Sequence, residues 1–102
     1  MKKKRIAILG STGSIGVQTL EVVEEHPLLF EVEVLTANNN SSLLIKQAEK
    51  FKPNVVVVAN KKKYDAVNSA LSVMGIKVFC GKESLEEVVE IENMDLVVTA
   101  LV

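Results

Sequence analysis

The fold of this chain is decided by one stretch near its N-terminus: Ile6-Ala7-Ile8-Leu9-Gly10-Ser11-Thr12-Gly13-Ser14-Ile15-Gly16. It begins with an apolar run typical of a short buried strand and ends where helical periodicity begins. Its glycines follow the spacing Gly-x-x-Gly-x-x-Gly. Strand, glycine turn and helix in this order are the setting of the dinucleotide fingerprint, whose usual spacing is Gly-x-Gly-x-x-Gly. The stretch therefore predicts a phosphate-binding turn between a strand and a helix.

Each glycine of this turn has a physical role in dinucleotide binding. Gly10 permits the tight turn out of the strand, Gly13 lets the backbone approach a pyrophosphate, and Gly16 lets the helix pack closely. Backbone N–H groups at the helix start, aided by the helix dipole, hold the phosphates. Hydroxyl groups add donors at three positions: Ser11, Thr12 and Ser14. The alternative is a glycine-rich turn with no ligand, whereas a P-loop is disfavoured because no Gly-Lys-Ser/Thr follows.

Strand and helix patterns alternate along the whole chain. Apolar runs predict five strands: Arg5–Leu9, Glu31–Ala37, Val55–Ala59, Lys77–Phe79 and Leu96–Leu101. Helical periodicity predicts helices over about 14–25, 42–51 and 61–73, and a fourth that begins near the capping box at 84–87. We therefore expect an α/β fold, a Rossmann-like doubly wound parallel sheet with helices on both faces. The first three strands would form one mononucleotide-binding half, and the fourth and fifth would begin the other side.

Two residues should mark the ends of the third helix. Asn60 is expected at its N-cap, because an asparagine side chain accepts from the first N–H groups of a helix. Gly75 is expected to end it, because glycine adopts the left-handed conformation common after a helix.

The end of the second predicted strand bears on the choice of cofactor. NAD-binding domains usually place Asp or Glu about 20 residues past the glycines, where the carboxylate binds the ribose 2′-hydroxyl. Here that region reads Ala37-Asn38-Asn39-Asn40-Ser41-Ser42, with no carboxylate. A 2′-phosphate would meet no like charge there and could accept hydrogen bonds, which favours NADP over NAD. An asparagine-rich turn that caps the next helix is the plainer interpretation, and both can hold together.

The last predicted strand is the third candidate surface. Ligands of this fold lie at the carboxyl ends of the strands, so Thr99-Ala100-Leu101-Val102 should line the nicotinamide side, unless it is only core. The chain ends on this bare apolar strand, and we therefore expect it to be one NADPH-binding domain, residues 1–102, cut from a longer multi-domain protein.

Composition is that of an ordinary soluble domain: 102 residues, 48% hydrophobic, 25% charged and a net charge of -1. This balance argues against nucleic acid or an anionic membrane as the main partner. One cysteine, Cys80, and one histidine, His26, leave no disulfide, no metal-ligand spacing and no Ser-His-Asp arrangement. We interpret Cys80 as structural and partly buried, the Lys61–Lys63 run as a surface cluster tied to no site, and the location as cytoplasmic.

The whole pattern resembles the 1-deoxy-D-xylulose 5-phosphate reductoisomerase family. The resemblance rests on residues 6–16, Thr19-Leu20 with Val22-Val23, the Leu35-Thr36-Ala37 strand end, Lys52-Pro53 and the segment 95–102. It implies an enzyme of isoprenoid biosynthesis by the methylerythritol phosphate pathway. Such an enzyme rearranges 1-deoxy-D-xylulose 5-phosphate and reduces the product with NADPH, giving 2-C-methyl-D-erythritol 4-phosphate. It uses a divalent metal (Mg, Mn or Co) and is typically a homodimer.

The resemblance also implies roles for individual residues. Thr12, Gly13, Ser14 and Ile15 would contact the cofactor phosphates. The turn Ala37, Asn38, Asn39 and Asn40 would surround the adenosine 2′-phosphate, and Ala100, Leu101 and Val102 would border the nicotinamide. Family members often have glycine, a basic residue and asparagine after the second strand, and here only Asn40 matches, so selectivity for NADPH would be softer. No catalytic or metal-binding residue can be carried over, and the fragment alone should be inactive.

Two other functions stay open on the sequence alone. One is another NADP-linked reductase, such as an aspartate-semialdehyde dehydrogenase-like protein, which would carry a nucleophilic cysteine downstream. The other is a nucleotide-sensing regulatory domain, which would need a complete chain near this length.

Overall fold

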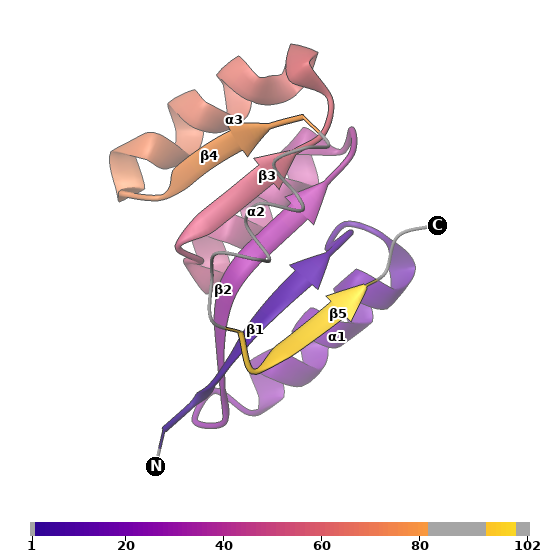
Figure 1. Ribbon diagram of the computed structural model, residues 1–102, viewed down its shortest axis with the longest axis vertical. Helices are drawn as coiled ribbons and strands as arrows, with labels where there is room; N and C mark the ends of the chain where they lie inside the picture. The colour runs from indigo at the N-terminus through magenta and orange to yellow at the C-terminus, as the bar shows by residue number, and fades with distance from the viewer. Residues whose placement is uncertain (1, 82–93, 100–102) are drawn as a thin grey trace.

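The computed structural model describes residues 2–81 and 94–99 of the chain. Strands and helices alternate through this part, as the sequence predicts (Figure 1). In chain order the elements are β1 (Lys4–Leu9), α1 (Ser14–Glu25), β2 (Phe30–Ala37), α2 (Ser41–Phe51), β3 (Val55–Val58), the 3-10 helix η1 (Lys61–Lys63), α3 (Tyr64–Leu71), the 3-10 helix η2 (Ser72–Met74), β4 (Lys77–Cys80) and β5 (Leu96–Thr99). The fourth predicted helix, near Ser84, lies outside the described residues.

The described strands form one parallel sheet in the order β4-β3-β2-β1-β5. This order confirms a Rossmann-like parallel fold. The expectation that the fourth strand begins the other side of the sheet is wrong, because β4 pairs with β3, and of the strands described here β5 alone lies beyond β1. The crossover from β3 through α3 to β4 runs in the same direction across the sheet as the two crossovers before it. As a result, β4 pairs with the free edge of β3.

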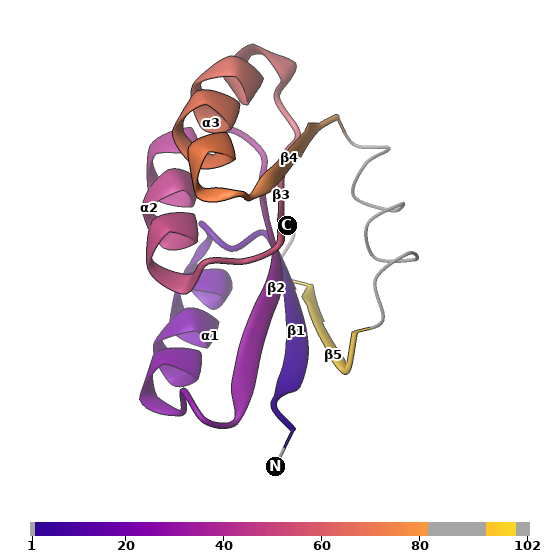
Figure 2. The same cartoon turned by 90° about the vertical axis from the view of Figure 1, so that its left-hand side faces the viewer.

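The helices α1, α2 and α3 all cover one face of this sheet (Figure 2). Alternate strand residues such as Ile8, Leu35 and Val56 join the core beneath them, together with Leu44 and Leu71 from the helices. The residues between them point to the opposite face, where a second cluster gathers: Ala7, Val34, Val55 and Val57, with Met94 packed against it. Both faces of the central strands are therefore apolar, which explains their continuous hydrophobic runs.

A β-bulge in β2 changes which residues face the helices. Ile6 and Ala7 of β1 pair with Val32 and Val34, so Glu33 is an extra residue in the strand. Val32 consequently belongs to the helix-side core, whereas Val34 belongs to the cluster on the other face. Without the extra residue, simple alternation would place both on the same face.

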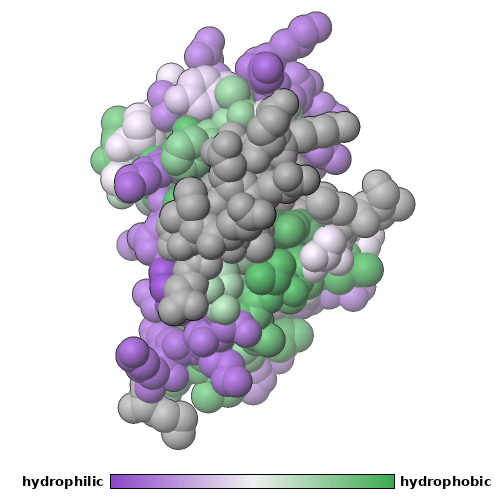
Figure 3. All heavy atoms as spheres, viewed as in Figure 1, coloured by the Kyte–Doolittle hydropathy of each residue, from purple (hydrophilic) through white to green (hydrophobic). Residues whose placement is uncertain are grey.

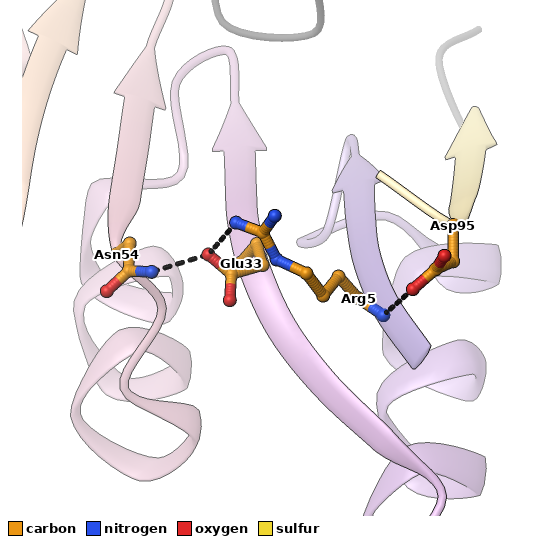
Figure 4. A network of polar contacts seen from close by, with 4 residues as sticks. All are labelled: Arg5, Glu33, Asn54 and Asp95. Atoms are coloured by element: carbon orange, nitrogen blue, oxygen red, sulfur yellow. Dashed lines mark hydrogen bonds and ion pairs between the residues drawn. The ribbon is translucent and has the colours of Figure 1, made fainter. Parts of the chain in front are cut away.

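The bulged Glu33 is buried but has polar partners (Figure 4). Its carboxylate lies 3.1 Å from the Arg5 guanidinium and accepts a hydrogen bond from the Asn54 side-chain amide. The backbone N–H of Arg5 donates to the Asp95 carboxylate at 2.7 Å. One connected set of polar groups therefore joins β1, β2 and the segments that precede β3 and β5.

The helix ends mostly follow the predicted signals. The Asn60 side chain accepts from the N–H of Lys62, and Gly75 takes a left-handed conformation with φ of 80°, as expected. The predicted single third helix is instead α3 flanked by η1 and η2.

Beside β5, hydrophobic atoms gather on the face seen in Figure 3. Leu96 and Val97 of this strand are 41% and 43% exposed. None of the helices in the described ranges is long and apolar enough to cross a membrane.

Candidate functional site

The glycine turn joins β1 to α1 at the carboxyl edge of the sheet. Gly10 has a φ of 85°, in the left-handed region that favours glycine, as the sequence predicts. Its N–H donates to both the hydroxyl and the carbonyl of Thr36, at 2.9 and 3.1 Å. The N–H of Gly13 donates back to the Gly10 carbonyl at 3.1 Å. The turn is therefore fixed by bonds within itself and to the end of β2.

Gly16 allows α1 to lie directly against this turn. A Cβ at this position would lie 2.4 Å from the Gly10 carbonyl oxygen and 2.6 Å from the Ser11 Cα. Any side chain would force the helix away from the turn, which confirms the close packing predicted for Gly16.

The N-terminus of α1 is open toward the same edge. Gly13 is its N-cap residue, and no side chain caps it, whereas Asn40 caps α2 and Asn60 caps η1. The first N–H groups of a helix have no carbonyl one turn earlier, which here concerns those of Ser14 and Ile15. Both residues are exposed and the first turn holds no acidic side chain. The structure thus presents uncapped donors beside an exposed glycine, a geometry suited to an anion.

Ser11 does not have the role that we expected for its hydroxyl. Its side chain is buried, donates to Gln47 Oε1 at 2.7 Å and also lies 3.3 Å from the Thr36 carbonyl. Gln47 Nε2 in turn donates to the Ser11 carbonyl at 2.8 Å, and the Ser11 N–H donates to the Thr36 carbonyl at 2.8 Å. Every polar group of Ser11 is engaged within the protein, so it holds the turn in place and offers no donor to a phosphate.

Gln47 is the structural partner that sequence reasoning missed. Its place on the inner stripe of the second helix was visible in the periodicity, but a buried amide there is unusual. That unusual polarity was the signal that it has a specific partner.

The asparagine turn (Asn38 to Asn40) follows β2 at the same edge. Ala37 is buried, and all three asparagines are exposed. Asn40 Oδ1 accepts from the Leu43 N–H at 3.2 Å, so the cap interpretation is confirmed. Because Gly10 and Ser11 are bonded to Thr36, the residue before Ala37, the glycine turn and the asparagine turn are neighbours.

The remaining predicted site residues are less informative. Thr99 at the end of β5 is exposed, and Ala100, Leu101 and Val102 lie outside the described residues. Cys80 is half-buried at the end of β4, as expected. Within residues 2–81 and 94–99, no group of three or more His, Cys, Asp or Glu side chains could hold a metal ion.

Comparison with known proteins agrees on one family. The family model described as 1-deoxy-D-xylulose 5-phosphate reductoisomerase matches residues 6–102. The reductoisomerase of Bacteroides thetaiotaomicron is 56% identical over 101 residues, which are 99% of this chain and 26% of that protein. The reductoisomerase of Halothermothrix orenii is 43% identical over 98% of this chain and 26% of its own length. The chain thus spans about a quarter of the length of these relatives.

Solved structures give the same result. The Zymomonas mobilis reductoisomerase in complex with NADPH superposes with a TM-score of 0.88 at 28% identity, covering 94% of this chain and 25% of that one. A reductoisomerase in complex with NADPH, fosmidomycin and magnesium gives a TM-score of 0.89 at 29% identity, covering 96% of this chain and 24% of that one. By sequence and by fold, this chain belongs to the 1-deoxy-D-xylulose 5-phosphate reductoisomerase family.

Proposed function

We propose that this chain is the NADPH-binding domain of a longer 1-deoxy-D-xylulose 5-phosphate reductoisomerase. The observation that carries the proposal is the uncapped N-terminus of α1, which opens from a glycine turn held rigid by its own hydrogen bonds. Family membership supports the identity of the nucleotide, since members of this family have been solved in complex with NADPH.

The residues at this edge fit the two charged groups of the adenine half of NADPH, which are the pyrophosphate and the 2′-phosphate. Thr12, Ser14 and Ile15 would hold the pyrophosphate through backbone N–H groups and the two hydroxyls, and Gly13, which has no side chain, would let the pyrophosphate approach the backbone. The carboxylate that binds a ribose 2′-hydroxyl in NAD-binding domains is absent from the asparagine turn, so a 2′-phosphate meets no repulsion there. Asn38, Asn39 and Asn40 would surround that phosphate.

The whole protein would rearrange 1-deoxy-D-xylulose 5-phosphate and reduce the product to 2-C-methyl-D-erythritol 4-phosphate, with the nicotinamide supplying hydride. A divalent metal would be held by residues after Val102, and the protein would be a cytoplasmic homodimer. Ala100, Leu101 and Val102 would border the nicotinamide. The chain's own contribution is to bind and orient the cofactor.

The test is a calorimetric titration of the full-length protein with NADPH and then with NADH, at the same salt concentration. We expect NADPH to bind, and to bind more tightly than NADH. The full-length protein should oxidise NADPH when 1-deoxy-D-xylulose 5-phosphate and Mg²⁺ are both present, and the 102-residue chain alone should not.

Two results would overturn this function. Absence of NADPH binding by the full-length protein would leave the glycine turn with a purely structural role. Turnover by the 102-residue chain alone would contradict the division between cofactor binding here and catalysis elsewhere.

A further inference from the structure

The end of β3 is hydrogen-bonded to the asparagine turn beyond the last residues of the sheet. The N–H of Ala59 donates to the Ala37 carbonyl at 2.8 Å, and the N–H of Asn60 donates to the Asn38 carbonyl at 3.0 Å. The side chains are also joined, since Asn60 Nδ2 donates to Asn39 Oδ1 at 2.8 Å. Three bonds therefore fix the start of the next segment against the proposed 2′-phosphate site.

That next segment is a cluster of positive charge. Lys61, Lys62 and Lys63, here called the lysine cluster, form η1 directly after Asn60, and all three are exposed. Asn60 holds their backbone, because its side chain accepts from the Lys62 N–H at 2.9 Å and its carbonyl accepts from the Lys63 N–H at 3.0 Å. The sequence alone tied these lysines to no site, and the Asn39–Asn60 contact changes that assignment.

The asparagine turn needs charge from elsewhere if it is to hold a phosphate. From Ala37 to Ile45 there is no lysine or arginine, and Lys46 is the first cation along α2. Amides and N–H groups can donate to a phosphate, but a cation gives much stronger, charge-assisted hydrogen bonds. The nearest acidic residue after the cluster, Asp65, is exposed in the first turn of α3. The backbone that carries these three lysines is thus held against a turn that has no charge of its own.

Building on the proposed function, we propose that the lysine cluster supplies the cation for the adenosine 2′-phosphate and thereby determines the preference for NADPH over NADH. The charge that selects the cofactor is then contributed by η1, which follows β3, and not by the asparagine turn itself.

The experiment compares NADPH and NADH binding by the full-length protein carrying K61Q/K62Q/K63Q. The matched control is Lys77→Gln, an exposed lysine at the first residue of β4, which pairs with Val55 at the opposite, amino edge of the sheet. We expect the triple variant to lose roughly tenfold or more in NADPH affinity, with NADH affinity changed by less than about twofold. The control and a triple Lys→Arg variant should keep the wild-type preference.

The outcomes separate this inference from the proposed function. If the wild-type protein binds neither nucleotide, the proposed function itself fails. If it binds NADPH but the triple Gln variant keeps the same preference over NADH, the lysine cluster has no part in selection. Equal weakening of both nucleotides would also overturn the inference, because a cation on the 2′-phosphate cannot act on NADH. Equal melting temperatures of the variants establish that each is folded.

Discussion

Single atoms decide how the glycine turn is built, and Gly16 is the clearest case. Gly16→Ala would place a methyl group 2.4 Å from the Gly10 carbonyl oxygen, which is backbone and cannot move aside without opening the turn. We expect a loss of about 2 to 3 kcal/mol in the free energy of unfolding, together with weaker nucleotide binding. Urea unfolding and NADPH titration would measure the two effects.

Gly75 provides the control for that substitution. It has a φ of 80° but nothing within 4 Å of where its Cβ would lie. Gly75→Ala should therefore cost only about 1 kcal/mol, through backbone strain, and Gly75→Asn less than that. An effect of Gly16→Ala no greater than that of Gly75→Ala would contradict the close-packing argument.

The Ser11–Gln47 pair allows a second prediction at this scale. Ser11→Ala leaves the buried Gln47 oxygen without its donor, and we expect a loss of about 1 to 3 kcal/mol. In the double variant S11A/Q47M the side-chain oxygen that lacked a donor is gone as well, although the backbone carbonyl of residue 11 loses its Nε2 donor. The loss in the double variant should therefore be smaller than the sum of the two single losses. Additive losses in a double-mutant cycle would show that the pair is not coupled.

At the scale of the element, substitutions of Asn40 can test separately the N-cap of α2 and the effect of a negative charge in the asparagine turn. Asn40→Ala removes the acceptor for the Leu43 N–H and should destabilise the protein by about 1 kcal/mol. Asn40→Asp keeps the cap and should keep the stability, because aspartate caps helices as well as asparagine does.

The same aspartate would stand beside the proposed 2′-phosphate. It should weaken NADPH binding by roughly tenfold through like-charge repulsion and leave NADH binding nearly unchanged. Thermal unfolding and parallel titrations of both variants would check this. A turn that is not near the phosphate would give an Asn40→Asp protein with an unchanged ratio of the two affinities.

Local pattern predicted the elements well, and their arrangement less well. The first helix has the predicted bounds, Ser14 to Glu25, and each strand whose predicted ends are both described differs from prediction by one residue at one end. The position of β4 could not be predicted in the same way, because a short strand pattern does not indicate which edge of the sheet the strand joins. The bulge at Glu33 was equally hidden, because the alternation Glu31-Val32-Glu33-Val34 has the pattern of an ordinary strand with one polar face.

The candidate site divides along the same line. Glycines at a fixed spacing indicate by themselves where the backbone needs a tight turn or close packing. The roles of Gly10 and Gly16 were therefore predicted correctly from the spacing alone. The buried partner of Ser11 and the contact between Asn39 and Asn60 depend on residues 36 and 21 positions away in the chain. The folded sheet, with α2 packed on it, brings these residues together.

At the scale of the whole molecule, one buried charge connects the strands. The side chain of Glu33 is 4% exposed and faces Arg5, whose backbone bonds to Asp95. Arg5→Met would leave the carboxylate with much less compensation, and we expect a loss of about 3 kcal/mol in the free energy of unfolding. Adding Glu33→Gln should restore part of it, because the buried group is then uncharged.

The exposed ion pair between Lys50 and Glu24 is the control. Its side chains are 56% and 52% exposed at a separation of 2.8 Å, so Lys50→Met should cost less than about 1 kcal/mol. Urea unfolding of the three variants would decide. Similar losses for Arg5→Met and Lys50→Met would mean that the network in Figure 4 contributes no more than a surface pair.

The internal hydrogen bonds of the glycine turn have a consequence for how a nucleotide arrives and leaves. The N–H groups of Gly10, Ser11 and Gly13 already donate hydrogen bonds within the protein, and Gly16 allows α1 to pack directly against this turn. The surface proposed to bind the nucleotide is therefore already formed before any ligand binds. A dinucleotide that binds there does not have to order a flexible loop. The conformational entropy that the protein loses on binding is therefore confined to a few side chains. Under the proposed function, NADPH could then bind and dissociate without a rearrangement of the backbone of this turn.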